Sequence, residues 1–187
     1  MKDRLGLAFF TFAAAVSILA AWPKGTSLLA WLAAFHNIVL AVLYSHRKPA
    51  SEYDYEGLGL GLIAAMLPLA TPYPVRIPLL LTIMGILGYS LILWSLLSLG
   101  SRFGIGPADR GLVVQGPYRW VRHPMYLGEL VLRMALVAAS PQPLISIALW
   151  VVLVVIQILR AGREEHIISG YSAYARQVRF RLIPGVW

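Results

Sequence analysis

Six stretches of mostly apolar residues follow one another along the chain and are separated by short polar connectors. A helix needs about 20 such residues to cross the hydrocarbon core of a bilayer. The pattern predicts membrane helices over residues 5–21, 28–44, 57–70, 77–99, 125–139 and 144–159. We therefore expect an all-α fold, a polytopic transmembrane helical bundle of about five to six membrane segments.

Two connections refine this picture. A Pro-Gln-Pro turn at residues 141–143 joins the last two segments, and so short a turn favours antiparallel neighbours. The basic start and apolar run of residues 1–21 resemble a signal peptide, but Ala-Ala-Trp at residues 20–22 lacks a small-x-small cleavage site. We therefore expect this stretch to be retained as the first span.

Composition agrees with a membrane protein, because 59% of the residues are hydrophobic and only 13% are charged, against about 25% charged in soluble proteins. The net charge of +8 comes from connectors and tail and includes no Lys/Arg block, so we expect no nucleic-acid partner. Cysteine is absent, which excludes disulfides and thiolate chemistry. The four histidines, His36, His46, His123 and His166, lack the spacing of a metal site, so no metal is expected.

The distribution of positive charge predicts an orientation. With six spans both termini lie on one side, and the opposite side holds only Lys24 and Arg76, while Arg133 falls inside the fifth segment. Cytoplasmic loops carry the excess of Lys and Arg. We therefore expect both termini, the connector of residues 100–122 and the tail to face the cytoplasm, where connector and tail could form one site.

The connector ends in LVVQGPYRWVRHPMY, residues 112–126. Pro124 biases His123 away from helical conformation and can itself begin the next helix. Gly116 permits close backbone approach, and Tyr126 falls on the first helical turn near His123. An interfacial belt of Tyr, Trp and Arg side chains is the alternative interpretation, although a belt requires neither the Gly-Pro-Tyr turn nor the His-Pro pair.

A second polar cluster lies just past the last apolar segment. Arg160 and Glu164 are four residues apart and share a helix face, and Glu165 follows. One interpretation is a surface ion pair at the membrane exit. The other is functional, with one carboxylate binding a ribose or an amine and Arg160 binding an acidic group.

Three further features lie inside apolar segments. Glu129 and Arg133 are four apart in the fifth segment, where they either neutralise each other or line a polar cavity. The His36-Asn37 pair predicts a hydrogen bond between helices. The three glycines of residues 57–61 predict close helix packing, because no lysine or serine follows to complete a phosphate-binding loop.

Together these residues resemble a known family. The resemblance rests on Gly116-Pro117-Tyr118, on Arg-His-Pro-Met-Tyr-Leu-Gly at residues 122–128, on Arg160-x-x-x-Glu164-Glu165, and on Tyr171, Tyr174 and Ile183-Pro184. These motifs are similar to those of the isoprenylcysteine carboxyl methyltransferase family, whose wider group includes phospholipid N-methyltransferases. The resemblance covers the chain from about Arg110 onward.

The resemblance implies an integral membrane methyltransferase that uses S-adenosylmethionine and releases S-adenosylhomocysteine. It implies one domain, with residues 1–99 as N-terminal helices and residues 100–187 as the catalytic half. The implied cofactor-binding residues are Arg110, Gly111, Leu112, Val113, Gly116, Tyr118, His123, Pro124, Met125, Tyr126 and Glu164. The implied catalytic residues are Arg160, Glu164 and Glu165, with Arg160 placed at the methyl acceptor.

The implied acceptor is lipid-like or prenylated and enters from the bilayer, and no metal is needed. Three alternatives remain open on sequence alone. The first is a phospholipid amine N-methyltransferase. The second is an NADPH-dependent sterol-type reductase, since that group has a similar Arg-His-Pro-x-Tyr stretch. The third is a small membrane transport or assembly protein without enzymatic activity.

Overall fold

The computed structural model describes residues 2–22, 28–72, 74 and 76–187. The α-helices of this part of the chain are α1 (Lys2–Ala21), α2 (Leu28–Ser45), α3 (Tyr55–Ala70), α4 (Leu79–Leu99), α5 (Pro124–Ala138), α6 (Pro143–Ile167) and α7 (Tyr171–Gln177). The strands β1 (Glu52–Tyr53) and β2 (Ala108–Asp109) form an antiparallel pair. Two 3-10 turns, η2 (Gly100–Arg102) and η3 (Gly116–Arg119), lie in the connector between α4 and α5. The expected all-α bundle is therefore confirmed.

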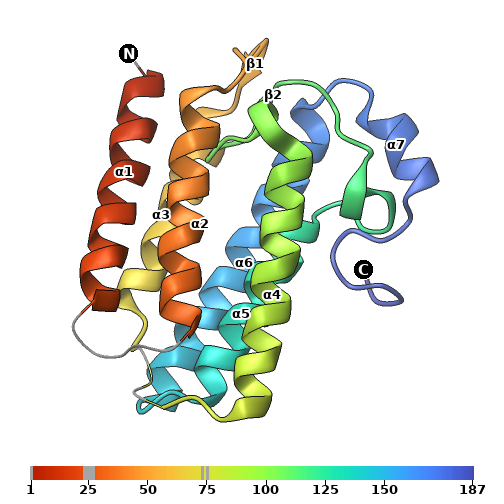
Figure 1. Cartoon of the computed structure of the whole chain (residues 1–187). Coiled ribbons are helices and arrows are strands. Elements are labelled where there is room, and N and C mark those ends of the chain that lie inside the picture. Colours follow the sequence, from red (N-terminus) through yellow and green to blue (C-terminus); the bar gives the residue numbers. More distant parts are fainter. Residues whose placement is uncertain (1, 23–27, 73, 75) are drawn as a thin grey trace.

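The first six helices run side by side, as Figure 1 shows, and α7 lies off one end of the bundle. Helix α4 packs against α5, α1 against α2, and both α3 and α5 against α6. The start of α1 and the ends of α2, α4 and α6 lie at the same end of the bundle as α7. The connector between α4 and α5 therefore meets the C-terminal segment there, as the predicted order of spans requires.

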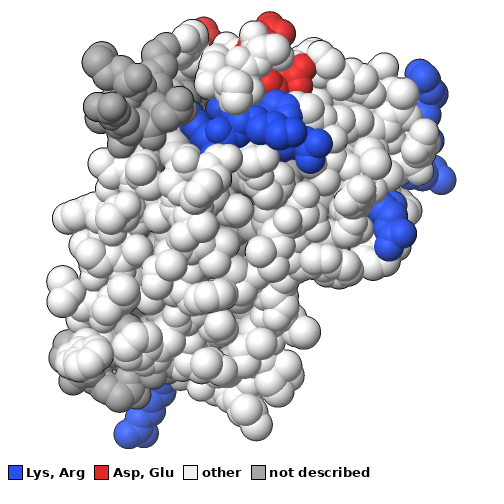
Figure 2. Space-filling model, turned by 45° about the horizontal axis from the view of Figure 1, so that its top comes forward, with Lys and Arg blue, Asp and Glu red and all other residues white. Residues whose placement is uncertain are grey.

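Three of the described helices are long and apolar enough to cross a membrane, over Leu28–Ser45, Leu79–Arg102 and Pro143–Ile167. Shorter apolar helices cover Gly6–Leu19 and Tyr55–Pro68. In Figure 2 charged side chains gather towards the ends of the molecule, and the flank between them is uncharged. An uncharged band of this kind suits the hydrocarbon layer. The predicted place of Lys24 on the opposite side falls outside the described residues.

Helices α4 and α5 cross at two glycines. A Cβ atom added to Gly88 would lie 2.8 Å from the carbonyl oxygen of Gly128 and 2.8 Å from the amide nitrogen of Leu132. One added to Gly128 would lie 2.8 Å from the carbonyl oxygen of Gly88. Small residues let helix backbones approach this closely inside membranes. The pair thus fixes α5, whose first residue adjoins the site, against α4.

The other helix contacts follow the sequence expectations with one exception. Asn37 Nδ2 donates a hydrogen bond to Ser17 Oγ at 2.9 Å, which confirms the predicted bond between helices. Gly57 and Gly61 are confirmed as close-packing positions, since an added Cβ would overlap Pro107 and Ile105 respectively. For Gly59 the prediction is wrong, because an added Cβ would meet nothing within 4 Å.

Candidate active site

The site begins where the connector becomes α5. His123 caps the helix with φ −125° and ψ 62°, and Pro124 is its first residue, as the sequence predicts. The C-terminal segment pairs with this corner, because Val121 and Phe180 form a parallel bridge. The amide of Arg122 donates to the Phe180 carbonyl at 2.9 Å, and that of His123 donates to the Arg181 carbonyl at 2.9 Å.

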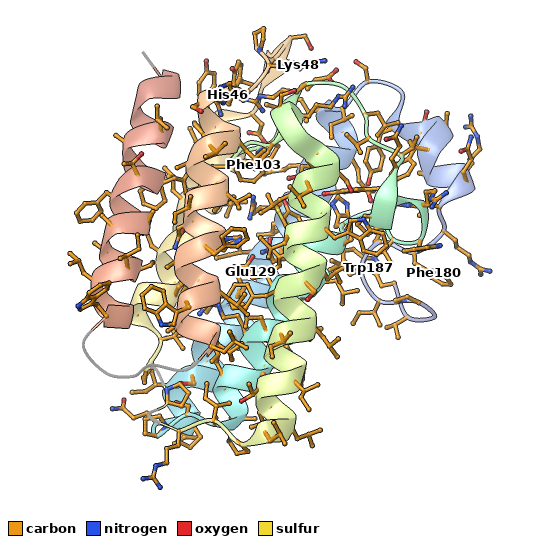
Figure 3. The ribbon with its side chains drawn as sticks, viewed as in Figure 1. His46, Lys48, Phe103, Glu129, Phe180 and Trp187 are labelled. Atoms are coloured by element: carbon orange, nitrogen blue, oxygen red, sulfur yellow. The ribbon has the colours of Figure 1, made fainter. Side chains whose placement is uncertain are left out.

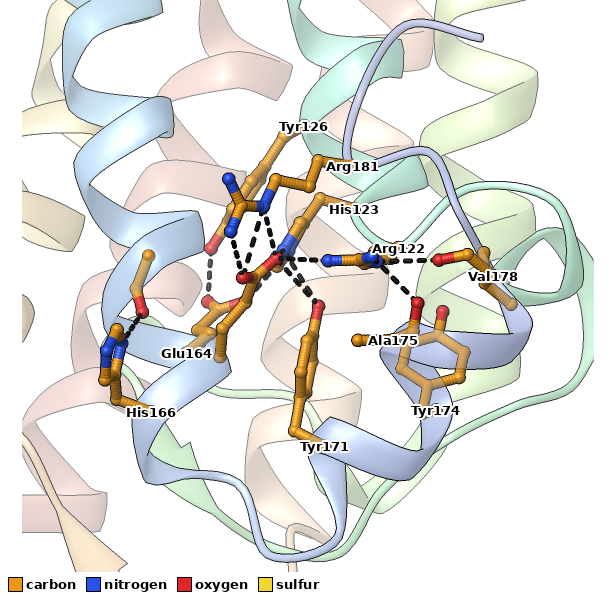
Figure 4. Close-up of polar contacts among 12 residues, drawn as sticks. Arg122, His123, Tyr126, Glu164, His166, Tyr171, Tyr174, Ala175, Val178 and Arg181 are labelled. Atoms are coloured by element: carbon orange, nitrogen blue, oxygen red, sulfur yellow. Dashed lines mark hydrogen bonds and ion pairs between the residues drawn. The ribbon is translucent and has the colours of Figure 1, made fainter. Parts of the chain in front are cut away.

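His123 is the centre of a buried polar cluster drawn in Figure 4. Its Nδ1 lies 3.4 Å from Glu164 Oε2, and its Nε2 lies 3.5 Å from Glu165 Oε1. The Tyr171 hydroxyl is 3.1 Å from His123 Nε2. The Tyr126 ring stacks on the imidazole, with centroids 5.4 Å apart and planes 4° apart, and its hydroxyl donates a short hydrogen bond to Glu164 Oε1.

The electrostatics of the cluster favour the charged form of His123. Burial alone would lower the pKa of His123, but the hydrogen bonds and charges of Glu164 and Glu165 outweigh it and raise that pKa above its ordinary value. Burial also raises the pKa of Tyr171, so this phenol remains a hydrogen-bond donor. The result is an imidazole held between two carboxylates, which favour its charged form, and two aromatic rings.

The two adjacent glutamates have different partners. Glu165 accepts hydrogen bonds from Arg181 Nε at 3.0 Å and from Arg181 Nη2 at 2.8 Å, and its Oε1 lies 3.3 Å from Arg122 Nη1. Arg122 in turn donates from Nε to the Val178 carbonyl at 2.7 Å. Glu165 therefore anchors the C-terminal segment, whereas Glu164 remains with His123 and Tyr126.

Asp109 positions the loop that faces this cluster. Its Oδ1 accepts a hydrogen bond from the Gly111 amide at 3.0 Å, and its Oδ2 accepts one from the Ser169 amide at 3.1 Å. The hydrogen bonds from Ser169 and Gly111 hold the pKa of Asp109 below its usual range despite burial. Asp109 thus ties the turn after β2 to the turn between α6 and α7.

A cavity, partly open to solvent, lies between the connector, the start of α5 and the end of α6. The predicted site residues that line it are Arg110, Gly111, Leu112, Val113, Tyr118, His123, Met125, Tyr126 and Glu164. Residues separated by about 50 positions in the sequence are therefore brought together around one space.

The other predicted site residues lie near the cavity but not in its lining. Gly116 has φ +59°, and a Cβ there would overlap Ser98, so its close approach is to α4 rather than to a ligand. Pro124 is buried at the start of α5, and Glu165 is turned to the C-terminal segment. Arg160 is also buried and lies one helical turn below Glu164.

Arg160 belongs to a polar chain inside the bundle. Its Nη2 donates to the Ile105 carbonyl at 2.8 Å, its Nη1 donates to Gln157 Oε1 at 3.2 Å, and its guanidinium carbon lies 4.7 Å from the Tyr126 ring centroid. Gln157 Nε2 donates to Glu129 Oε2 at 2.5 Å. Figure 3 shows Glu129 well below Phe103 and midway along the bundle.

The polar contacts of Arg160 and Glu129 bear on two ion pairs considered in the sequence analysis. Among the ion pairs of the described residues, none joins Arg160 to Glu164 or Glu129 to Arg133. The hydrogen-bond partner of Glu129 therefore comes from α6, and mutual neutralisation of Glu129 and Arg133 stays a prediction. Surface pairing of Arg160 is wrong, since Arg160 is buried.

Several lining residues were absent from the predicted site. These are Leu99, Arg102, Phe103, Gly104, Gly106, Pro107, Ala108, Arg122, Ile168, Tyr171 and Tyr174. Arg122, Tyr171 and Tyr174 belong to the motifs on which the family resemblance rests, so the sequence contained a signal that could have placed them in the site. The stretch of residues 99–108 carries three glycines and an arginine in a connector, but only the fold shows that it returns to the cavity.

Comparison with known families decides the class of protein. The sequence model of the family described as phospholipid methyltransferase matches residues 76–174. The chain belongs to the phospholipid methyltransferase family. It is therefore an integral membrane methyltransferase, and the matched range includes every residue that lines the cavity. No curated protein matches the chain.

Proposed function

We propose that this phospholipid methyltransferase family member uses S-adenosylmethionine to methylate a lipid-like acceptor at the membrane surface. The observation that carries the proposal is the cavity at the end of the apolar bundle, where Glu164 and His123 meet the loop of residues 110–113. A polar cofactor would reach the cavity from the aqueous side, and a lipid-like acceptor would reach it from the bilayer.

The lining suits the groups that such a cofactor carries. Glu164 supplies a carboxylate for a ribose hydroxyl or an ammonium group. The aromatic rings of Tyr118, Tyr171 and Tyr174 line the cavity, and such rings attract a sulfonium cation. Gly111, with φ +92°, adopts a backbone conformation that favours glycine.

The chemistry requires alignment more than proton transfer. S-adenosylmethionine, when bound, supplies a methyl group on a sulfonium centre that is open to in-line displacement. The task of the chain is to hold the acceptor atom in line with that methyl group and to exclude water. Buried His123 contacts Glu164 and holds it in place, and Tyr126 holds it from α5.

Two acceptor classes deserve separate tests. The resemblance to isoprenylcysteine carboxyl methyltransferases favours a prenylcysteine-like carboxylate. The matched family, described as phospholipid methyltransferase, favours a phospholipid amine. The buried position of Arg160 weakens its assignment as a direct partner of an acceptor carboxylate, because Gln157 and the Ile105 carbonyl already bind its terminal nitrogens.

Thermal unfolding in detergent tests the cofactor. S-adenosylhomocysteine should raise the midpoint of unfolding, and NADPH should not, because ligands stabilise the state that binds them. Glu164→Gln should weaken the shift by S-adenosylhomocysteine, whereas Glu52→Gln, on exposed β1, should preserve it. Stabilisation by NADPH alone would favour a reductase and overturn the proposal. Equal shifts by S-adenosylhomocysteine for Glu164→Gln and Glu52→Gln would also overturn it.

Transfer of a labelled methyl group distinguishes the acceptors. Purified protein is incubated with labelled S-adenosylmethionine and either an S-prenylated N-acetylcysteine or phosphatidylethanolamine. Label in the first, released by mild base, indicates a carboxyl ester, and base-stable label in the second indicates an N-methylated amine. Label in neither lipid, with cofactor binding intact, contradicts the lipid-like acceptors named here.

A further inference from the structure

The cavity has a basic wall, in which Arg110 belongs to the cofactor-binding residues implied by the family resemblance and Arg102 does not. Arg102 ends η2, directly after α4, and Arg110 follows β2. Both side chains line the same cavity as Glu164. Glu164 is the only carboxylate among the described lining residues, whereas Arg102, Arg110 and Arg122 all contribute guanidinium groups.

The three arginines differ in how many of their N–H donors already bind groups of the protein. Arg122 is committed to protein, since its Nε binds the Val178 carbonyl, its Nη1 binds Glu165 and its Nη2 binds the Ala175 carbonyl. Arg110 Nε donates to the Lys48 carbonyl at 3.1 Å, and the Arg110 guanidinium carbon lies 5.3 Å from the Tyr53 ring centroid. Arg102 Nε is buried and has no hydrogen-bond partner among the described residues. An arginine stays charged at all relevant pH values, so Arg102 presents an unsatisfied positive donor on this wall.

Glycines of the connector lie beside both guanidinium groups. Gly104 lies against Arg110, where an added Cβ would come 2.7 Å from Arg110 Nη1. Gly111 lies against Arg102, where a Cβ would come 3.4 Å from Arg102 Nε. The two arginines therefore pack on glycines of the connector that builds the cavity, and they are parts of a built wall rather than solvated surface side chains.

We propose that Arg102 and Arg110 form an anion subsite in this cavity, which binds a carboxylate or phosphate group of a bound ligand. Guanidinium groups match the planar geometry of both anions. A cavity lined by Glu164, tyrosines and two arginines suits a ligand that carries both a cation and an anion. The proposal rests on the proposed function for the identity of that ligand, and the anion has two sources: the amino-acid carboxylate of the cofactor or an acidic group of the acceptor.

The variant Arg102→Gln tests the subsite, because Arg102 carries no bond that the fold needs among the described residues. Arg110→Gln is unsuitable, since it would also break the bond to Lys48. Arg119→Gln is the matched control, as Arg119 is exposed on η3 and outside the cavity lining. The unfolding midpoint of each variant without ligand checks folding, and Arg102→Met, which removes the charge but keeps an unbranched side chain, replaces Arg102→Gln if the latter fails to fold.

Two ligands separate the sources of the anion. S-adenosylhomocysteine carries the amino-acid carboxylate, and 5′-methylthioadenosine lacks it. If the cofactor supplies the anion, Arg102→Gln weakens S-adenosylhomocysteine about ten- to a hundredfold, the range for a charged hydrogen bond, and leaves 5′-methylthioadenosine unchanged. If the acceptor supplies it, both dissociation constants are unchanged, and KM for the acceptor rises about tenfold at constant kcat.

Inorganic phosphate keeps the test independent of the proposed function. Phosphate should raise the unfolding midpoint of the wild type and of Arg119→Gln but not of Arg102→Gln. A wild type that responds to phosphate and not to S-adenosylhomocysteine refutes the cofactor assignment while retaining the subsite. Equal responses of wild type and Arg102→Gln to phosphate, to S-adenosylhomocysteine and to acceptor overturn the subsite.

Discussion

At the scale of single residues, the neighbouring Glu164 and Glu165 of α6 have different partners because they point in different directions. Successive helical side chains point about 100° apart, so Glu164 faces the cavity while Glu165 faces Arg122 and Arg181. The sequence brought both into one predicted site, because spacing alone does not say which of two adjacent carboxylates points to a ligand. Only the positions of Arg122 and Arg181 separate their roles.

Gln157 carries a prediction at this scale. Gln157→Leu removes the bonds to Glu129 and Arg160 while nearly preserving volume, and each buried group left unpaired costs about 1–3 kcal/mol. We expect a clear fall in the unfolding midpoint in detergent. Gln177→Leu, at the exposed end of α7, makes the same chemical change and should leave the midpoint almost unchanged. Equal midpoints for the two variants would show that the buried chain contributes nothing to stability.

At the scale of elements, the helices were predictable and the connector was not. Long apolar runs set the spans, and the His-Pro pair set the first residue of α5. Gly116 was correctly predicted to allow a close approach to its backbone, but the group that approaches it is Ser98 of α4. Residues such as Arg102 and Asp109 act through contacts with Gly111 and Ser169, which lie in other turns, so no local pattern could assign them to the site.

The crossing of α4 and α5 gives the prediction at this scale. Gly88→Ala places a Cβ 2.8 Å from backbone atoms of α5, and overpacking of this kind costs about 1–3 kcal/mol. Gly59→Ala meets nothing within 4 Å, so it should leave the unfolding midpoint unchanged or raise it slightly, because alanine favours a helix by about 0.5–1 kcal/mol over glycine. Similar midpoints for the two alanine variants would contradict the observed crossing.

At the scale of the whole molecule, the charge distribution predicts which side of the membrane holds the site. The chain has no cysteine, so single cysteines report position without background. Gln142→Cys lies in the turn between α5 and α6, and Ser172→Cys lies in α7. In intact cells a membrane-impermeant maleimide should label Gln142→Cys at once and Ser172→Cys only after permeabilisation. The reverse pattern would invert the predicted orientation, and equal labelling would show that α6 does not separate the two sides.

The bridge between Val121 and Phe180 has a consequence for the order in which the protein is made. Residues 178–181 are synthesised after every helix of the bundle, yet they supply the backbone partners of Arg122 and His123 and the arginine that holds Glu165. A nascent chain can therefore insert all of its apolar segments before the cavity is closed. Competence for methyl transfer would thus appear only after residues 178–181 have been synthesised and have paired with the corner at Arg122 and His123.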